Sequence, residues 1–343
     1  MDSQALDEKQ AVARIFNSAL AAPAIGAAWE LGIFDELRNK KRMNPEEYSL
    51  KHDLHVASVQ GMVTALASVN ILKRDQHEIV AGNLFEEAYH TKSLFHWITL
   101  GSGDLFTRMQ YHLKNEHRKG QYYTRDDAAI SYACRDINEQ YIDPTWLAAV
   151  DGLDFKFSTV VDLGCGSGGR LMQILKRYPD VRGIGVDIAL PSMKVAEGEA
   201  AEYGLTNRLS FSEGNALKLS YRDEYADVDL MTSFMMGHDF WPIESCVATL
   251  KRLRVAFPKV RRFFLGDTTR FVMYGGDPKY GITESNVPVF TLGFEFIHAM
   301  MGVKIPSMDD WDEAFALSGW RLVKKHLTDS QPPLWVIFEL EHA

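Results

Sequence analysis

Apolar positions in the first part of the chain recur at helical spacing. From Gln10 to about Leu37 they follow the repeat of three to four residues that is typical of an amphipathic helix, with Pro23 and Gly26 as expected break points. A further helix is expected after Asn44, because this capping residue is followed by a proline and two acids. The chain therefore opens with helices.

The next segment predicts one more helix and then a hairpin. Residues 56–72 keep helical spacing, and two short runs, 71–74 and 78–80, flank a polar turn. Three helices and a hairpin make a winged-helix arrangement, a module that binds DNA or pairs subunits. The acidic balance of the chain favours pairing. We therefore expect a dimerisation domain over residues 1–100 and a helical linker over 101–152 that contributes to the substrate pocket.

The second half changes to short apolar runs that alternate with amphipathic helices. These runs, rich in Val and Ile, lie at 159–163, 183–186, 208–212, 228–233, 262–265, 321–325 and 334–340. Strands that alternate with helices predict a doubly wound α/β sheet. We expect residues 153–343 to form one catalytic domain.

Composition narrows the class of protein. With 343 residues, 46% hydrophobic and 24% charged, the chain is typical of a folded protein of two domains. The N-terminus has no leader pattern, no apolar run is expected to span a bilayer, and three scattered cysteines do not frame disulfides. We expect a cytoplasmic protein without a membrane partner. The net charge of -9 disfavours a nucleic-acid partner.

A glycine-rich loop is the strongest chemical signal. The apolar run 160–163 leads directly into the loop 164–169, after which a helix begins. Glycines allow positive φ and close backbone approach to a nucleotide at a helix start. This loop also fits the dinucleotide pattern G-x-G-x-x-G, so the glycines alone are ambiguous. Asp162 favours S-adenosylmethionine, because a carboxylate can accept a bond from its amino group and would repel a pyrophosphate.

Two later strand ends complete a cofactor pattern. Asp187 ends the next strand and can hold both ribose hydroxyls, and Asn215 follows the third strand and can meet the adenine edge. The run 160–216 resembles class I S-adenosylmethionine-dependent methyltransferases, with Asn215 where many members carry Asp. The resemblance implies a Rossmann-like α/β domain preceded by a mostly helical, winged-helix-like dimerisation domain. The candidate cofactor residues are Asp162, Gly164, Gly166, Gly168, Asp187, Asn215, Ala216 and Ser233.

The fourth strand leads to a histidine at the edge where open α/β sheets place their active sites. His238 and Asp239 are followed by Phe240 and Trp241, and with the N-terminal module this run looks like plant-type small-molecule O-methyltransferases. In that reading His238 is the general base. Phe240, inserted between Asp239 and Trp241, departs from the pattern of that family.

A closer resemblance is to metal-containing C-methyltransferases of 2-oxo acids. The run 237–242, a second histidine at His298 and Arg125 carry it. It implies that His238 and His298 bind one iron or zinc ion, that the ion stabilises the enolate of the substrate, and that Arg125 binds the substrate carboxylate. Asp239 could be a third ligand, a group that orients a ligand, or the proton acceptor. His298 could instead be a buried helix histidine, and Arg125 could pair with a neighbouring aspartate.

Three hypotheses follow. The first is methylation of the β-carbon of a small 2-oxo acid in natural-product biosynthesis from amino acids, by a homodimer. The second is O-methylation without a metal, with His238 as base. The third is a winged-helix regulator that only binds the nucleotide. Candidate substrates for the first are phenylpyruvate, indolepyruvate, branched oxo acids, 2-oxoglutarate and the arginine-derived 5-guanidino-2-oxopentanoate.

Overall fold

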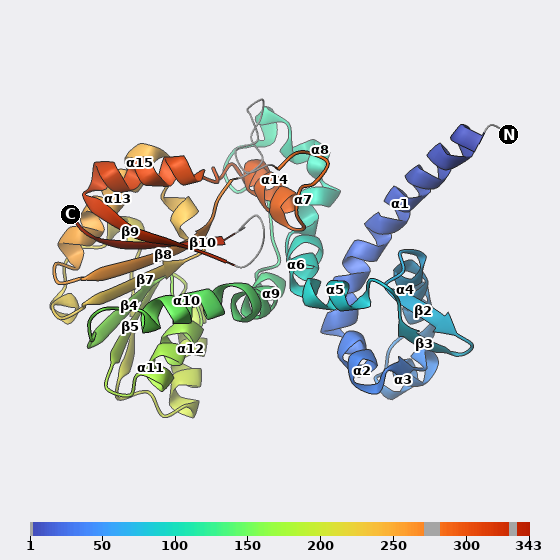
Figure 1. Ribbon diagram of the computed structural model, residues 1–343, viewed down its shortest axis with the longest axis horizontal. Helices are drawn as coiled ribbons and strands as arrows, with labels where there is room; N and C mark the ends of the chain where they lie inside the picture. The colour runs from blue at the N-terminus through green and yellow to red at the C-terminus, as the bar shows by residue number, and fades with distance from the viewer. Residues whose placement is uncertain (1–2, 271–281, 329–334) are drawn as a thin grey trace. The chain divides into compact units, whose positions relative to one another are not determined.

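The computed structural model of the chain describes residues 3–270, 282–328 and 335–343. It forms two compact units, Met1–Glu139 and Gln140–Ala343, which are considered one at a time (Figure 1). The boundary divides the predicted linker 101–152 between the two units. The predicted three-part division of the chain stays a prediction.

Helices dominate the N-terminal unit. They are α1 (Ser3–Glu30), α2 (Ile33–Lys40), α3 (Pro45–Lys51), α4 (Val56–Ser68), α5 (Phe85–His90), α6 (Lys92–His96), α7 (Gly103–Thr107), α8 (Met109–His112) and α9 (Asp127–Ile137). As predicted, Asn44 caps α3, and its side chain accepts bonds from the N–H groups of Glu46 and Glu47. The last turns of α1 pack with α2 and α4 around a core that includes Ile33, Phe34 and Val63.

The predicted hairpin is present. β2 (Leu72–Asp75) and β3 (Glu78–Ala81) pair antiparallel, and the short β1 (Arg42–Met43) adds to β3 to give the order β1-β3-β2. Three helices with this small sheet form the winged-helix-like arrangement that the sequence indicates.

The expected breaks at Pro23 and Gly26 are wrong, because α1 runs through both residues. The helix ends at Glu30, and Gly32, with a φ of 74°, then turns the chain into α2. Packing explains Gly26: a Cβ atom there would lie 3.0 Å from the Cα atom of His96 on α6. The glycine therefore allows two helices to approach closely, and this contact outweighs its low helix propensity.

The expectation that no apolar run spans a bilayer stays a prediction. By length and composition alone, Asp7–Glu30 of α1 is long and apolar enough to cross a membrane, with a mean hydropathy of 1.3. Core helices of soluble proteins meet the same criterion. Part of α1 is such a core helix, because Ala24, Ile25 and Ala28 are buried in the N-terminal unit.

A mixed seven-stranded sheet forms the centre of the C-terminal unit. Its strands are β4 (Thr159–Leu163), β5 (Arg182–Asp187), β6 (Leu209–Glu213), β7 (Leu230–Phe234), β8 (Arg262–Thr268), β9 (Trp320–Leu327) and β10 (Trp335–His342). The order is β6-β5-β4-β7-β8-β10-β9, parallel up to β8, with β10 antiparallel to both neighbours. All seven predicted strands are confirmed, although Leu334 of the last predicted run lies outside the described residues.

Helices cover both faces of this sheet, as expected for a doubly wound fold (Figure 1). The α-helices of this unit are α10 (Asp143–Asp151), α11 (Gly169–Arg177), α12 (Leu190–Glu202), α13 (Ile243–Ala256), α14 (Thr291–Met301) and α15 (Met308–Ser318). In the figure, α10, α11 and α12 lie on one side of the sheet, and α13 and α15 lie on the other. The parallel strands therefore direct their carboxyl ends to one common edge, where polar side chains gather.

Candidate active site

The glycine loop joins β4 to α11 in left-handed backbone conformations. Gly164, Gly166 and Gly168 have φ values of 69°, 53° and 73°, which side chains rarely adopt. A Cβ atom on Gly164 would lie 2.6 Å from Met236 Sδ, whereas nothing lies within 4 Å of one on Gly166. The loop thus packs against Met236, just after β7, on one side and leaves Gly166 open. An open glycine backbone at a helix start is the cradle that a nucleotide needs.

Asp187 ties this loop to the end of β5. Its Oδ2 atom accepts the N–H of Gly166 at 2.8 Å, and its Oδ1 atom accepts the N–H of Ala189 at 2.8 Å. The Gly166 N–H is therefore bonded to a side chain of the protein. Two remaining lone pairs of the carboxylate stay available for a pair of ribose hydroxyls.

Asp162 is buried at the end of β4, with only 1% of its surface exposed. Thr232 on β7 donates its hydroxyl to Oδ1 at 2.6 Å, and Oδ2 has no hydrogen-bond partner among the described residues. Burial raises the pKa of this carboxyl to about 6. A buried carboxylate oxygen without a partner fits the ammonium group of a bound cofactor.

The remaining predicted cofactor residues lie at the ends of β6 and β7. Asn215 caps the short helix η4 (Ala216–Lys218), where its Oδ1 atom accepts the Leu217 N–H at 2.9 Å. Its amide NH₂ group can still meet an adenine edge. Ser233 is fully buried and donates its hydroxyl to the Leu163 carbonyl at 3.1 Å, so it joins β7 to β4. Its cofactor role and that of Ala216 stay predictions.

His238 lies on the short helix η6 (Gly237–Phe240) just after β7, and a buried carboxylate of β8 holds it. Asp267 accepts the backbone N–H of His238 at 2.6 Å through Oδ2 and bonds to its Nδ1 atom at 2.7 Å through Oδ1. A carboxylate can only accept, so Nδ1 is the donor and the lone pair of the neutral ring lies on Nε2. Gly237 makes this possible, because a Cβ atom there would lie 2.7 Å from Asp267 Oδ2.

His298 lies on α14 and is brought next to His238. The two ring centroids are 5.0 Å apart, with an interplanar angle of 84°, and both rings are almost fully buried. His298 Nδ1 lies 2.8 Å from the Phe294 carbonyl oxygen, to which it can only donate. The neutral ring therefore also carries its lone pair on Nε2.

The acid that orients His238 is one that the sequence did not single out. Asp239 was a candidate for this task, but it is exposed and Asp267 makes both bonds to His238. Asp267 has only 1% of its surface exposed. A signal was available, since Asp267 follows the apolar run 263–265 at the carboxyl end of a strand. Register across β7 and β8 was needed to connect it with His238.

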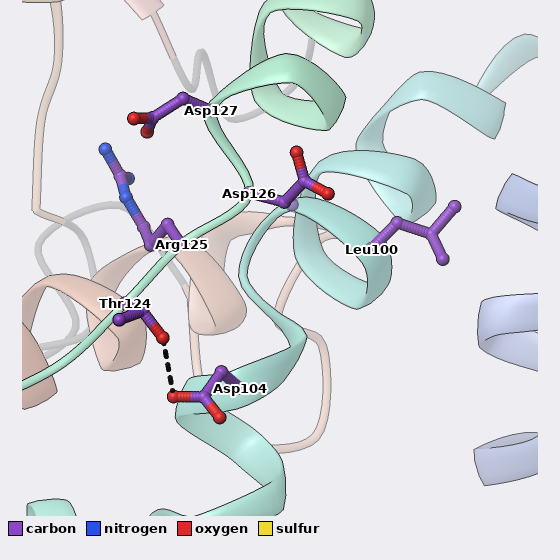
Figure 2. Close-up of a pocket in the computed structure, with 7 residues that line it drawn as sticks. Leu100, Asp104, Thr124, Arg125, Asp126 and Asp127 are labelled. Carbon is purple, nitrogen blue, oxygen red and sulfur yellow. Dashed lines mark hydrogen bonds between the residues drawn. The ribbon is translucent and has the colours of Figure 1, made fainter.

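Arg125 belongs to the N-terminal unit and lines a pocket of about 470 Å³ with Leu100, Gly101, Asp104, Thr124, Asp126 and Asp127. Figure 2 shows the Thr124 hydroxyl bonded to Asp104, at 3.1 Å. Asp126 turns away to cap α9, where it accepts the Ala129 N–H at 3.0 Å. Within the described residues no ion pair joins Arg125 to Asp126 or Asp127. The charge of the Arg125 guanidinium group is therefore not neutralised by an ion pair with either of these aspartates.

The sheet order, the glycine loop and the acids at the ends of β4 and β5 define a nucleotide-binding transferase site of the Rossmann-like class. A family model described as a methyltransferase domain matches residues 160–256. The chain is 54% identical to "Methyltransferase ungE'" of Aspergillus campestris over 343 residues, all of both chains.

Two more distant likenesses cover nearly the whole chain. Identity to the indolepyruvate C-methyltransferase of Streptomyces griseus is 26%, over 91% of this chain and 89% of that protein. The structure is similar to that of the mitomycin 7-O-methyltransferase MmcR, with a TM-score of 0.68, 17% identity and all of both chains covered. This protein therefore belongs to the class I S-adenosylmethionine-dependent methyltransferases, with an O-methyltransferase-like architecture. The predicted family, fold class and methyl donor are confirmed.

Replacement of Asp187 by Ala should weaken cofactor binding. The change removes the acceptor for the ribose hydroxyls and releases the N–H groups of Gly166 and Ala189. We expect the Kd for S-adenosylhomocysteine, measured by isothermal titration calorimetry, to rise at least about tenfold, since each lost charged hydrogen bond contributes about 1.5–3 kcal/mol. Asp180→Ala, in an exposed turn, is the control. An unchanged Kd for Asp187→Ala would contradict this assignment.

Replacement of Asp267 by Asn should reduce turnover and spare cofactor affinity. The amide cannot impose the Nδ1–H tautomer on His238 as a carboxylate does. We expect kcat to fall by about 10- to 100-fold, the usual effect of losing a carboxylate that orients a functional histidine. The Kd for S-adenosylhomocysteine should stay constant. Glu244→Gln, an exposed change in α13, controls for loss of charge. Full turnover in Asp267→Asn would show that Asp267 is only structural.

Proposed function

We propose that the protein methylates the β-carbon of a small 2-oxo acid, with a bound metal ion, in natural-product biosynthesis. The observation that carries this proposal is the buried pair His238 and His298, whose ring centroids are 5.0 Å apart and whose Nδ1 atoms are both engaged elsewhere. Likeness over nearly the full chain to an indolepyruvate C-methyltransferase supports it.

The residues present fit a metal ion that is completed by its substrate. Each Nδ1 is held by an acceptor, which puts the lone pair of each neutral imidazole on Nε2, the tautomer that ligating histidines commonly have. Across the described residues no group of three or more His, Cys, Asp or Glu side chains is placed to hold an ion. A two-histidine iron or zinc site leaves positions for two oxygens of a 2-oxo acid and for water.

When bound, the ion would supply Lewis acidity toward the 2-oxo group, and S-adenosylmethionine would supply the methyl group. The side chains of the protein would do the rest. Asp267 holds His238 in one tautomer, and burial of both imidazoles keeps water from them. Asp239 is exposed beside His238, and we assign to its carboxylate the acceptance of the β-proton. Asp267 cannot take this role, because it is buried and bonded to His238 and Thr268.

The surroundings of the pair favour an aromatic or otherwise apolar substituent on the substrate. The ring of Phe294 lies 4.1 Å from that of His298, and Phe290 and Trp335 continue the aromatic series. Phenylpyruvate and indolepyruvate are therefore the first candidates. For Arg125, whose guanidinium group makes no ion pair with its neighbouring aspartates, we keep the proposal that it binds the carboxylate of the substrate.

O-methylation of a small hydroxyl compound is the alternative function. The pair of His238 and Asp267 is itself the arrangement of a general base, with the lone pair on Nε2, and it needs no metal to take a hydroxyl proton. In that case His298 would only support the ring of His238. The acceptor atom, carbon or oxygen, is thus what separates the two functions.

We further propose that the protein acts as a cytoplasmic homodimer, without nucleic-acid or membrane partners, and that its N-terminal unit forms the interface. The first half of α1 carries apolar side chains at helical spacing that are 52–71% exposed: Val12, Ile15, Phe16 and Leu20. An exposed apolar stripe of this kind is typical of an interaction surface.

Each histidine variant tests the proposed metal site. His238→Ala and His298→Ala should each remove the ion from purified protein, as measured by elemental mass spectrometry, because two ligands cannot be reduced to one without a large loss of affinity. Both should keep the wild-type Kd for S-adenosylhomocysteine. The wild type should accelerate exchange of the β-protons of phenylpyruvate in deuterated water without a methyl donor, and the variants should not. His77→Ala, in an exposed turn, is the control.

Contrary results would select the alternative. If the wild type binds no ion, resists chelators and shows no exchange, and if His298→Ala retains methylation of a phenol, O-methylation with His238 as base replaces the first proposal.

The double change Ile15→Glu and Phe16→Glu should convert the dimer to a monomer, because it places charges within the apolar stripe. Light scattering coupled to size exclusion at micromolar concentration measures the mass. Val255→Glu, at a residue of α13 that is 72% exposed, is the control and should leave the mass unchanged. A wild type that is already monomeric would disprove the dimer.

A further inference from the structure

Arg170 is a mostly buried cation beside the cofactor loop, and the reaction described so far does not use it. It is the second residue of α11, directly after the glycine loop, and its side chain is only 12% exposed. Its guanidinium carbon lies 3.8 Å from the centre of the Phe234 ring. Because Phe234 is the last residue of β7, the guanidinium group lies over the carboxyl end of that strand.

The guanidinium group is only loosely paired. Its Nη2 atom is 3.9 Å from Oδ1 of Asp143 on α10, too far for a hydrogen bond. The Nε atom of Arg170 and Oδ1 of Asp143 are both buried without hydrogen-bond partners among the described residues. Oδ2 of Asp143 instead accepts the side-chain amide of Gln173 at 2.7 Å. Buried charged donors in proteins are normally hydrogen-bonded, so this arrangement is typical of a group that meets a ligand.

The strand register places Arg170 on the same face of the sheet as Asp162. Asp162 and Thr232 are paired across β4 and β7, and the Thr232 hydroxyl donates to Asp162 Oδ1 at 2.6 Å. Phe234 follows Thr232 by two positions on β7, so their side chains share one face. Trp146 of α10 covers this face, with its ring centroid 5.4 Å from that of Phe234, and α10 and α11 lie on one side of the sheet (Figure 1).

Asp162 and Arg170 also stand at the two ends of the glycine loop 164–169. The loop folds back on itself, because the Gly168 N–H donates to the Cys165 carbonyl at 2.8 Å. Oδ2 of Asp162 is buried without a partner, and within the described residues no ion pair joins Asp162 to Arg170. Two groups of opposite charge thus flank one loop without neutralising each other. Such a pair is complementary to the ammonium and carboxylate groups of an α-amino acid.

The start of α11 favours the negative group of such a ligand at the Arg170 end. Its N-cap residue is Gly168, which provides no side chain to cap the helix. The N–H groups of the first helical turn have no acceptor within the helix, and the helix dipole adds partial positive charge there. Arg170 belongs to this turn, so its guanidinium group and the helix start favour an anion at the same end of the loop.

We propose that Arg170 binds the α-carboxylate of S-adenosylmethionine while Asp162 receives its α-ammonium group, so that the two side chains together hold the amino-acid end of the methyl donor. The contact with Asp162 is the one predicted from the sequence, and the contact with Arg170 goes beyond it. A planar guanidinium group can pair with a carboxylate through two donors. The proposal concerns the cofactor alone and is therefore independent of the acceptor atom.

Ligands that differ at the amino-acid end test this assignment in calorimetric titrations. S-adenosylmethionine carries both groups, and decarboxylated S-adenosylmethionine keeps only the ammonium group. Arg170→Met should raise the Kd for S-adenosylmethionine by about 10- to 100-fold, because a charged hydrogen-bonded pair is lost. The Kd for the decarboxylated ligand should stay constant or fall, because the variant removes a cation that repels a cationic ligand.

Further variants and one more ligand control the measurement. Methylthioadenosine lacks the amino-acid end, and an unchanged Kd for it in Arg170→Met would show an intact adenosine site. Asp162→Asn should weaken both ligands that carry an ammonium group. Arg170→Lys keeps the charge without the planar pair of donors and should lie between the wild type and Arg170→Met. Lys176→Met, which removes an exposed cation from the same helix, should match the wild type.

Three results would overturn the proposal. If Arg170→Met weakens S-adenosylmethionine and its decarboxylated form equally, Arg170 does not act on the carboxylate. If methylthioadenosine is weakened as well, Arg170 only supports the structure of the loop. If the Kd for S-adenosylmethionine does not change, Arg170 has no part in cofactor binding, and a raised KM for phenylpyruvate in that case would assign it to the acceptor.

Discussion

Parallel pairing of β5, β4, β7 and β8 is the constraint on which the site depends. Parallel strands end at one edge, so this edge brings together Asp187, Asp162, His238 and Asp267. Asp162 and Asp267 are 105 positions apart in the sequence. The bonds at that edge run between neighbouring strands: Thr232 to Asp162, and His238 to Asp267. The predicted cofactor acids and His238 are thereby placed by one sheet.

Sequence patterns predicted this sheet well, because each strand is a short apolar run and each predicted site acid or histidine of the sheet lies near the carboxyl end of one. The glycine loop, Asp162 and Asp187 could be identified by position alone, and so could His238. The breaks at Pro23 and Gly26 failed for a reason that no local pattern contains, namely the close contact of Gly26 with His96 on a distant helix. Helix propensity depends on the sequence of one segment, whereas this contact depends on the packing of two helices.

Asp267 escaped prediction for a related reason. An aspartate at a strand end is an ordinary feature of a sequence. Its importance depends on which side chain lies opposite, and that follows from the register of β7 with β8. His298 was found only through resemblance, and its place 5.0 Å from His238, between ring centroids, required the fold of α14.

The bond between Asp187 and the Gly166 N–H has a kinetic consequence. It fixes the glycine loop before any ligand arrives, together with the bonds from Gly164 and Cys165 to the Val186 carbonyl. A loop that is already ordered does not lose conformational entropy when it is filled, so a larger share of the contact energy appears as affinity. Association therefore need not wait for a rare open conformer of the loop. The rate at which S-adenosylmethionine replaces S-adenosylhomocysteine is then set by how fast S-adenosylhomocysteine dissociates.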